Sequence, residues 1–399
     1  MPRGYRSYRG RRTRRGKIPI VFAALFLLIA LGLLYLSLSD SLVFSSEGIL
    51  FKNPFANKEK DEPTPSPLPS QLPGLIIESP SPSKTPEPSP TPTPKHETVI
   101  NAAYLPSLSD PVAIAGIIQL SENGTINAVV IDMKHDDGTL SYSSANQYAE
   151  QAGANPSEDY SVTALKELRD SGLYLIARVS AFKDNLVPRK IQSLSVKVQS
   201  GVIWLDRDYH GWMNPYLQEA QDYVTDISLE LADLGFDEVL LENFCYPTIG
   251  RPQLIAYGEH DSVPKTDTIS SFTEHLSALL REKNALLSIS LSSDTVIEGA
   301  DTALGHDVAS LYEVSDRIYV NIGTDADTSS AIYAKVQEIA QDYDTQDVSV
   351  KLVPVIVSLR SYDDPSASEN IQVAIGTYVP RGYGWVIYDD SGLYPSVGW

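Results

Sequence analysis

The sequence contains a single cysteine, Cys245, so no disulfide can form within the chain and no cysteine-based zinc site can be built. It also lacks a G-x-G-x-x-G motif after any early apolar run, so a dinucleotide-binding fold has no support. Asp132, Asp136 and Asp137 could together hold Ca²⁺, but their spacing matches no EF-hand loop. We therefore predict neither a cofactor nor a metal.

Basic residues are scarce outside the amino terminus. The chain has a formal net charge of −20, yet its first 17 residues hold seven Arg, one Lys and no acidic residue. The rest of the chain is therefore even more acidic than the total suggests. Because an acidic domain repels phosphate groups, we expect it to have no nucleic-acid partner.

A long apolar run follows the basic segment. Residues Ile18–Leu38 carry no charge, and about 20 such residues span a bilayer core of about 30 Å. A cleaved signal peptide is the alternative, but its apolar region is usually nearer about 10 residues, and residues 39–42 form a poor cleavage motif. We expect an uncleaved, single-pass anchor in the cell membrane. The positive-inside rule then places residues 1–17 in the cytoplasm and the carboxy-terminal domain outside the cell.

Proline is concentrated in residues 39–96, above all between Glu62 and Pro94, where it alternates with Ser and Thr. Proline lacks an amide hydrogen and fixes φ, so this segment cannot form a helix or a central strand. We predict a disordered, extended stalk that holds the following domain away from the membrane, for example within a cell wall. A ligand for a proline-binding domain is the less favoured alternative.

Eight short apolar runs alternate with helical patterns in residues 97–399, a length of about 300 residues that suits one α/β barrel. Runs such as AVVID and YLIARV lack polar alternation, as expected of strands that are covered on both faces. The predicted strands are Val99–Leu105, Asn127–Met133, Tyr174–Ser180, Glu238–Phe244, Leu286–Ser292, Arg317–Ile322, Ser349–Val357 and Gly384–Tyr388. We predict an α/β fold, a single (β/α)8 TIM barrel behind the transmembrane helix and the stalk.

Local signals mark two of the helices between these strands. Asp110-Pro111 is typical of an N-cap followed by proline in the first turn, and Asn214-Pro215 predicts the start of the clearest helix. Residues 195–212 fit no simple strand–helix unit. We expect them to form an excursion or a small hairpin after the third strand.

Active-site residues of a (β/α)8 barrel project from the carboxyl ends of its strands. This rule selects polar and aromatic residues that would meet at one rim. The substrate-binding candidates are Lys134, Asp137, Arg178, Lys183, Trp204, Trp212, Asn243, Tyr246, Asn321 and Tyr388. Structural alternatives stay open for several of them. Residues 136–138 also have the composition of an ordinary turn. Asp132 and Arg178 could be an ion pair that closes the barrel, and tryptophans are often core residues.

Five segments carry a resemblance to a known family. They are NAVVIDMKHDDGTLSY (Asn127–Tyr142), YLIARVSAFKDN (Tyr174–Asn185), WLDRDYHGWMNPY (Trp204–Tyr216), LGFDEVLLENFCYP (Leu234–Pro247) and GYGWVIYDDSGLY (Gly382–Tyr394). In order and spacing they resemble a bacterial and archaeal family described as a "putative glycoside hydrolase domain", itself distantly similar to α-amylase-type hydrolases. The resemblance implies a (β/α)8 barrel and hydrolysis of O-glycosyl bonds.

The second half of the rim departs from the family pattern. After the fourth strand the family has Asp-Tyr-x-Arg-Phe-Pro, where this chain has Glu242 for Asp and Cys245 for Arg. Ser290 stands where the fifth strand usually carries Asp, and residues 320–323 lack the usual Met-x-Tyr-Pro. The eighth strand usually presents Asn, where this chain has Asp389. These changes alter the charge of the implied site.

Glycoside hydrolysis normally requires two carboxyl groups that flank the scissile bond. By its position, Glu242 is the candidate nucleophile or base, and Asp132 or Asp389 is the candidate partner. The favoured hypothesis is a membrane-anchored, extracytoplasmic glycoside hydrolase that acts on a cell-envelope or extracellular polysaccharide. The alternative is a catalytically degenerate barrel that binds glycan or a partner protein. A purely structural envelope protein is the third hypothesis.

Overall fold

The computed structural model describes residues 42–45, 48–51, 98–323, 325–343, 347–357 and 367–394. The chain divides into two compact units, residues 1–87 and 88–399. In the first unit, β1 (Leu42–Ser45) pairs antiparallel with β2 (Gly48–Phe51), within the range expected to be stalk. The remaining stalk residues, the basic tail and the expected anchor at residues 18–38 lie outside the described residues. No helix of the described ranges has the length and apolar character needed to cross a bilayer.

The second unit contains a closed barrel of eight parallel strands, and this confirms the predicted (β/α)8 fold. The strands follow one another around the barrel in sequence order, and the last pairs with the first through Trp385 and Asn101. They are β3 (Asn101–Leu105), β4 (Ala128–Lys134), β5 (Tyr174–Ser180), β7 (Glu238–Glu242), β9 (Leu286–Leu291), β12 (Arg317–Asn321), β13 (Leu352–Val357) and β14 (Trp385–Tyr388). Each of the eight predicted runs overlaps one of these strands.

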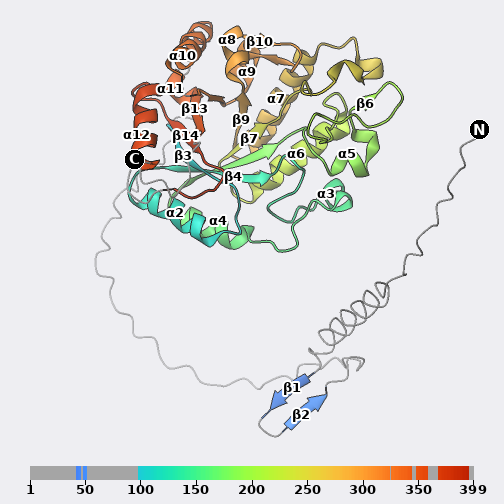
Figure 1. Cartoon of the computed structure of the whole chain (residues 1–399), viewed down its shortest axis with the longest axis vertical. Helices are drawn as coiled ribbons and strands as arrows, with labels where there is room; N and C mark the ends of the chain where they lie inside the picture. Colours follow the sequence, from blue (N-terminus) through green and yellow to red (C-terminus); the bar gives the residue numbers. More distant parts are fainter. Residues whose placement is uncertain are drawn as a thin grey trace, which may run out of the picture. The chain divides into compact units, whose positions relative to one another are not determined.

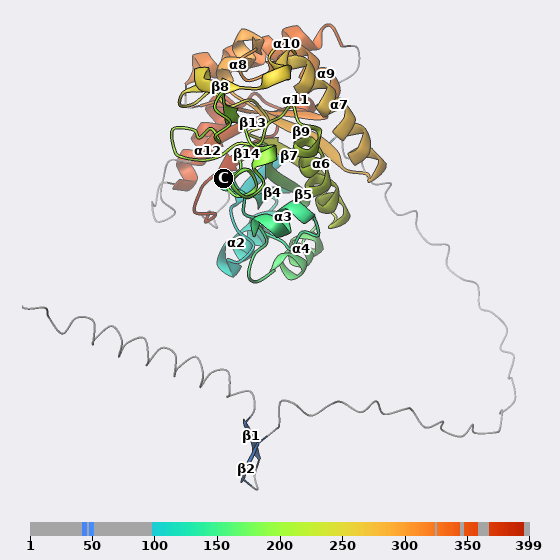
Figure 2. The same ribbon diagram turned by 90° about the vertical axis from the view of Figure 1, so that its right-hand side faces the viewer.

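Helices surround the barrel in both views (Figures 1 and 2). They are α2 (Pro111–Glu122), α3 (Gln147–Ala152), α4 (Ser161–Asp170), α5 (Val187–Lys190), α6 (Gln218–Asp233), α7 (Lys265–Glu282), α8 (Ser293–Glu298), α9 (Val308–Val314), α10 (Ala326–Ala340), α11 (Val348–Lys351) and α12 (Ala367–Tyr378). The cap of α2 is confirmed, because Asp110 Oδ1 accepts hydrogen bonds from the amides of Val112 and Ala113. The start predicted for α6 was three residues early. Asn214 instead forms a turn, in which its carbonyl accepts from the amide of Leu217.

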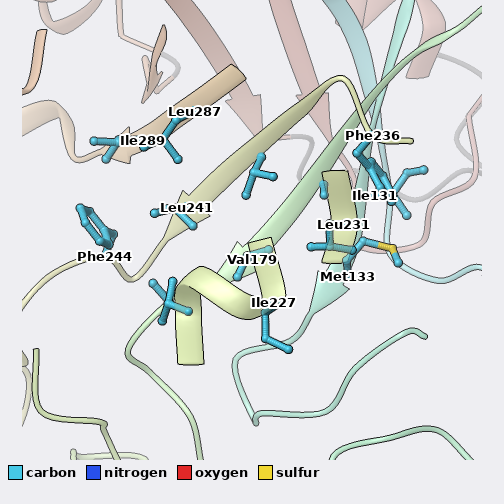
Figure 3. Close-up of a cluster of buried hydrophobic side chains, with 14 of the residues drawn as sticks. Ile131, Met133, Val179, Ile227, Leu231, Phe236, Leu241, Phe244, Leu287 and Ile289 are labelled. Atoms are coloured by element: carbon cyan, nitrogen blue, oxygen red, sulfur yellow. The ribbon is translucent and has the colours of Figure 1, made fainter. Parts of the chain in front are cut away.

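The helices are held by apolar faces that pack on the outside of the barrel. On α6, the buried residues Ile227 and Leu231 lie against Val179 of β5 and Met133 of β4 (Figure 3). Burying an aliphatic side chain of this size contributes about 1.5–3 kcal/mol. Because the outward residues of each strand are covered in this way, the inward residues are the ones available to a site.

The amino-terminal end of the barrel is closed by a buried polar cluster. Glu238 of β7 accepts hydrogen bonds from the hydroxyls of Tyr174 at 3.0 Å, Tyr319 at 2.7 Å and Ser288 at 2.5 Å, and it pairs with Arg317. The charged side chains of this cluster are almost completely buried. The cluster therefore serves the fold, and the open end of the barrel is the carboxyl end of the strands.

Two long connections stand beside that open end. Residues 195–212 form the expected excursion after β5, and residues 243–264 connect β7 to α7. They are joined where β6 (Lys197–Val198) pairs antiparallel with β8 (Ile255–Ala256). The indole of Trp204 also donates a hydrogen bond to the carbonyl of Arg251 at 2.9 Å. A second short pair, β10 (Ala300–Asp301) with β11 (His306–Asp307), follows α8.

Candidate active site

A cavity of about 590 Å³ opens at the carboxyl end of the barrel. Every barrel strand, or the residue directly after it, contributes to its wall. The lining residues are Tyr104, Asp132, His135, Asp136, Asp137, Arg178, His210, Glu242, Ser290, Asn321, Val355, Val357, Tyr388 and Asp390. This is the position at which (β/α)8 barrels place their active sites.

Arg178 lies at the centre of the charged groups in this cavity. Its Nη1 atom lies 3.0 Å from Oδ1 of Asp132, and its Nη2 atom lies 3.0 Å from Oδ1 of Asp136 and 2.6 Å from Oε2 of Glu242. The strand order explains this arrangement, because β5 runs between β4 and β7. Burial alone would lower the pKa of Arg178, but Glu242 and Asp132 raise it well above its usual range.

Asp132 is buried and fully engaged, which favours the structural alternative for this residue. It accepts a hydrogen bond from the hydroxyl of Tyr104 at 2.9 Å, and both of its carboxylate oxygens accept from Nη1 of Arg178, at 3.0 and 3.1 Å. Its Oδ2 atom also lies 3.1 Å from Nδ1 of His135. A carboxylate held by three donors is suited to orienting its neighbours. We therefore do not retain it as a catalytic acid.

The hydrogen bonds of His135 indicate that its ring is protonated at both nitrogens. The Ser141 hydroxyl donates to the carbonyl of Asp132 at 2.7 Å, so its oxygen accepts from Nε2 of His135 at 3.0 Å. The other nitrogen, Nδ1, faces the Asp132 carboxylate and needs a proton there. The hydrogen bond to Asp132 accordingly raises the pKa of His135, although burial opposes this shift.

Asp136 is held as an anion by two cations and an amide. Besides Arg178, its carboxylate contacts Nζ of Lys183 at 3.1 Å and Nδ2 of Asn243 at 3.0 Å. Burial would raise its pKa, but Arg178 and Lys183 lower it to about 2. Asn243 reaches this position from a left-handed backbone with φ of 48°, and it also contacts Ser180. Lys183 and Asn243 thus act on the cavity through Asp136.

Asp137 lines the cavity, and its Oδ1 atom also accepts the hydrogen bonds of an ordinary turn. This oxygen accepts from the amide and the hydroxyl of Thr139, at 2.9 and 2.7 Å. The following Gly138 has φ of 93°, and a Cβ atom there would lie 2.3 Å from Oδ1 of the buried Asp184. The turn therefore requires glycine at 138.

Glu242 ends β7 with its carboxylate at the cavity wall, and 24% of its side chain is exposed. Tyr388 comes from β14, which stands opposite β7 in the strand order. Burial and the nearby Glu242 raise the pKa of Tyr388 well above its usual range. The Tyr388 ring stacks on Tyr104 with centroids 4.5 Å apart, and its buried hydroxyl has no hydrogen-bond partner among the described residues. A ligand in the cavity could supply that partner.

The carboxylate that β14 presents to the cavity belongs to Asp390, which corrects the choice of Asp389. Asp389 is buried and accepts from the amide of Ser391 at 2.9 Å and from its hydroxyl at 2.5 Å. Asp390 is exposed and lines the cavity. Asp390 lies in the turn that follows β14, in which the amide of Gly392 donates to the carbonyl of Asp389 at 2.9 Å, and this turn places Asp390 at the cavity beside Tyr388.

The prediction that Lys134 binds substrate is also corrected, because this side chain lies outside the barrel. The pairing of β4 with β5 slips between Asp132 and Lys134, and this bulge turns Lys134 away from the inner face on which Asp132 lies. Its Nζ atom lies 2.9 Å from Oδ2 of Asp184 and 5.7 Å from the ring centre of Tyr223 on α6. Both members of this ion pair are completely buried.

Three of the predicted substrate-binding residues are core residues instead. Trp204, Trp212 and Tyr246 are buried, and none of them lines the cavity. The indole of Trp204 donates to the carbonyl of Arg251 at 2.9 Å, and the indole of Trp212 donates to Oδ2 of Asp206 at 3.2 Å. Tyr246 packs against Tyr216, and the Nζ atom of Lys265 lies 4.9 Å from the centre of the Tyr246 ring.

Asn321 does line the cavity, as predicted, and its Oδ1 atom accepts from the amide of Gly323 at 2.9 Å. The prediction of site residues missed Tyr104, His135, Asp136, His210 and Asp390. The signal for Tyr104 was its place on an inward register position of the first strand. No group of three or more His, Cys, Asp or Glu side chains within the described ranges is arranged to hold a metal ion.

The chain is similar to several solved structures. The glycoside hydrolase domain of PgaB (BpsB) from Bordetella bronchiseptica matches with 12% identity over 74% of this chain and 95% of that chain, with a TM-score of 0.54. A hypothetical protein from Ruminiclostridium thermocellum matches with 27% identity over 47% of this chain and 96% of its own, with a TM-score of 0.42. The catalytic domain of β-amylase from Paenibacillus polymyxa matches with 11% identity over 74% and 95%, with a TM-score of 0.48.

No curated protein matches the chain. The match to the PgaB (BpsB) domain shows a shared fold, which is that of a glycoside hydrolase domain. The family comparison is more specific, since residues 104–321, more than half of the chain, match the model described as "Putative glycosyl hydrolase domain". The matched region begins at Tyr104 and ends at Asn321, two residues that line the cavity. The chain therefore belongs to this glycosyl hydrolase-like family.

Proposed function

We propose that the barrel hydrolyses glycosidic bonds of an extracytoplasmic polysaccharide, with Glu242 as nucleophile or base and Asp390 as proton donor. The observation that carries this proposal is the position of Glu242, whose partly exposed carboxylate lies at the carboxyl end of β7 in the cavity. Two carboxyl groups that flank the scissile bond are the usual requirement of this reaction. Glu242 and Asp390 extend from strands on opposite sides of the barrel.

The other carboxylates of the cavity are less suited to donating a proton. Asp132 is enclosed by its three donors, and the pKa of about 2 keeps Asp136 ionised at ordinary pH. Their negative charge has a different use. The transition state of glycoside hydrolysis resembles an oxocarbenium ion, and fixed negative groups around it would stabilise the positive charge that develops.

Arg178 has a positioning role in this proposal. Its guanidinium contacts Oε2 of Glu242 and leaves the Oε1 atom of that carboxylate without a hydrogen bond in the described structure. Side-chain placement matters here because a displacement of about 1 Å can cost on the order of 100-fold in rate. The two anions that flank Arg178 hold it in turn, so Glu242 is fixed through a network rather than by a single contact.

A test of this proposal is to incubate the full-length protein with a panel of polysaccharides and to follow the release of reducing ends. The panel would contain peptidoglycan, chitin, cellulose, starch and soluble bacterial exopolysaccharides. Release from at least one glycan supports the hydrolase. Stable binding to a glycan without release would instead favour the non-catalytic alternative.

That alternative has an observation in its favour. Three of the cavity's carboxylates, those of Asp132, Asp136 and Glu242, form ion pairs with Arg178. The wall at β9 and β12 presents the uncharged residues Ser290 and Asn321. Such a wall could bind a glycan without cleaving it. Binding and hydrolysis measured on the same panel separate the two functions.

We further propose that the protein is anchored in the cell membrane by one pass, with its amino terminus in the cytoplasm. The uncharged run at residues 18–38 and the basic residues before it support this location. Protease added to intact spheroplasts should then digest the barrel while a tag at the amino terminus stays protected. Protection of the barrel in intact spheroplasts would overturn the orientation.

A further inference from the structure

Tyr209 combines two unfavourable features on one exposed turn. Its φ is 64°, in the left-handed backbone region that residues other than Gly, Asn and Asp rarely occupy. The other two non-glycine residues with positive φ in the described ranges are asparagines, Asn243 and Asn284. The Tyr209 side chain is also 75% exposed, so burial does not compensate for the strained backbone.

The surrounding turn holds this conformation firmly. Oδ1 of Asp206 accepts from the amides of Asp208 and His210, both at 2.9 Å, and its carbonyl accepts from the amide of Tyr209 at 3.2 Å. Arg189 adds a hydrogen bond from Nη2 to the carbonyl of Tyr209 at 2.7 Å. Four contacts thus fix the backbone, and the phenol ring is presented to solvent from a rigid support.

The turn is attached to the wall of the candidate active site. His210, the residue after Tyr209, lines the cavity. Asn185 joins the same turn to another lining residue, Asp137. Its side-chain Oδ1 accepts from the backbone amide of Gly211 at 3.1 Å, and its backbone amide donates to the carbonyl of Asp137 at 3.1 Å. Tyr209 is therefore the direct chain neighbour of a residue in the cavity wall.

We infer that Tyr209 is a stacking platform for a sugar ring of the same chain whose neighbouring ring occupies the cavity. This inference rests on the proposed function. An exposed aromatic ring on a rigid support loses little conformational freedom when a ligand covers it, and a large aromatic surface is well suited to the apolar face of a sugar. Tyr209 thus makes the protein selective for glycan chains longer than the cavity holds.

The test uses full-length protein carrying Glu242→Gln, so that binding is measured without hydrolysis. The probes are insoluble peptidoglycan, chitin, cellulose and starch, and the readout is the fraction sedimented at rising glycan concentration. Tyr209→Ala should weaken binding to the preferred glycan by about 10-fold, whereas Tyr209→Phe keeps the ring and should bind as the parent does. Tyr160→Ala removes another exposed tyrosine and is the matched control.

A stability measurement separates this role from a structural one. Tyr209→Gly should lose affinity as Tyr209→Ala does, yet raise the melting temperature by about 1–3 °C, because glycine adopts positive φ without strain. A structural role for the ring predicts a lower melting temperature instead. Parent-like binding by Tyr209→Ala would overturn the inference and leave the proposed function standing. Loss of binding by Tyr209→Ala, in a protein that cleaves no glycan, would keep the inference and overturn the hydrolase. A parent that neither binds nor cleaves any glycan would overturn both.

Discussion

The Nη2 atom of Arg178 lies 2.6 Å from Oε2 of Glu242, and the same nitrogen contacts Oδ1 of Asp136. With Nη1 on Asp132, one guanidinium thus binds three carboxylates, which come from β4 and β7 on either side of β5 and from the loop after β4. The proposed nucleophile or base is therefore positioned by a side chain that is itself held from two other sides.

Replacing Arg178 tests this dependence. Arg178→Lys keeps one positive charge but offers no planar fork, so it cannot bridge the three carboxylates. We expect kcat/KM for glycan hydrolysis to fall by about 100-fold or more, with a smaller loss of thermal stability. Arg281→Lys is the control, since the exposed Arg281 on α7 also pairs with an aspartate, Asp316, but does not line the cavity. An active Arg178→Lys enzyme would show that Glu242 needs no such positioning.

The two consecutive aspartates after β14 provide a matched comparison. Asp390→Asn removes the proposed proton donor and should lower kcat by about 100-fold or more. Asp389→Asn keeps an oxygen that can accept from Ser391, so activity should stay within a few-fold of the parent. Steady-state kinetics on a cleaved polysaccharide compare the two variants. The reverse order of effects would restore Asp389 as the catalytic residue.

His135 should make stability depend on pH. Its pKa is raised in the folded protein, so its contribution is fully present below the unfolded value of about 6.5 and is lost as pH rises through the folded value. The stability difference between the parent and His135→Gln should therefore shrink as pH increases from about 6 to 9. Chemical denaturation at each pH measures it, and the exposed His275→Gln is the control. A difference that is constant over this range would contradict the Asp132–His135 pairing.

Lys134 should matter for stability rather than for substrate. Lys134→Met leaves the buried Asp184 without its cation, and breaking a buried pair from one side costs about 3–5 kcal/mol. The variant should melt at a lower temperature, yet the folded fraction should keep its KM. Denaturant titration and kinetics below the melting transition report the two effects separately. A raised KM with parent-like stability would return Lys134 to the substrate site.

The barrel and part of the rim were predictable because they depend on periodicity. Apolar runs of the right length identified all eight strands, and the rule that active sites form at strand carboxyl ends selected Arg178, Glu242, Asn321 and Tyr388. These residues lie within strands, where alternation determines which side chains face inward. The lining of the cavity by all four is what such alternation produces.

The failures have local causes that composition does not reveal. One bulge at the end of β4 moved Lys134 out of the barrel, and a shift of one residue after β14 exchanged Asp389 for Asp390. Trp204 and Trp212 lie in the excursion after β5, whose packing depends on the distant 243–264 connection. Such contacts between loops are set by tertiary structure, so sequence patterns alone could not distinguish core tryptophans from sugar platforms.

The most direct test of the proposed chemistry compares the parent with Glu242→Gln. Both full-length proteins would be incubated with the polysaccharide that the parent cleaves fastest, beside Glu274→Gln as an exposed control on α7. We predict that Glu242→Gln releases reducing ends at least about 1,000-fold more slowly while its melting temperature and glycan binding stay close to those of the parent. Release at the parental rate by Glu242→Gln would contradict the central claim that this carboxylate carries the chemistry.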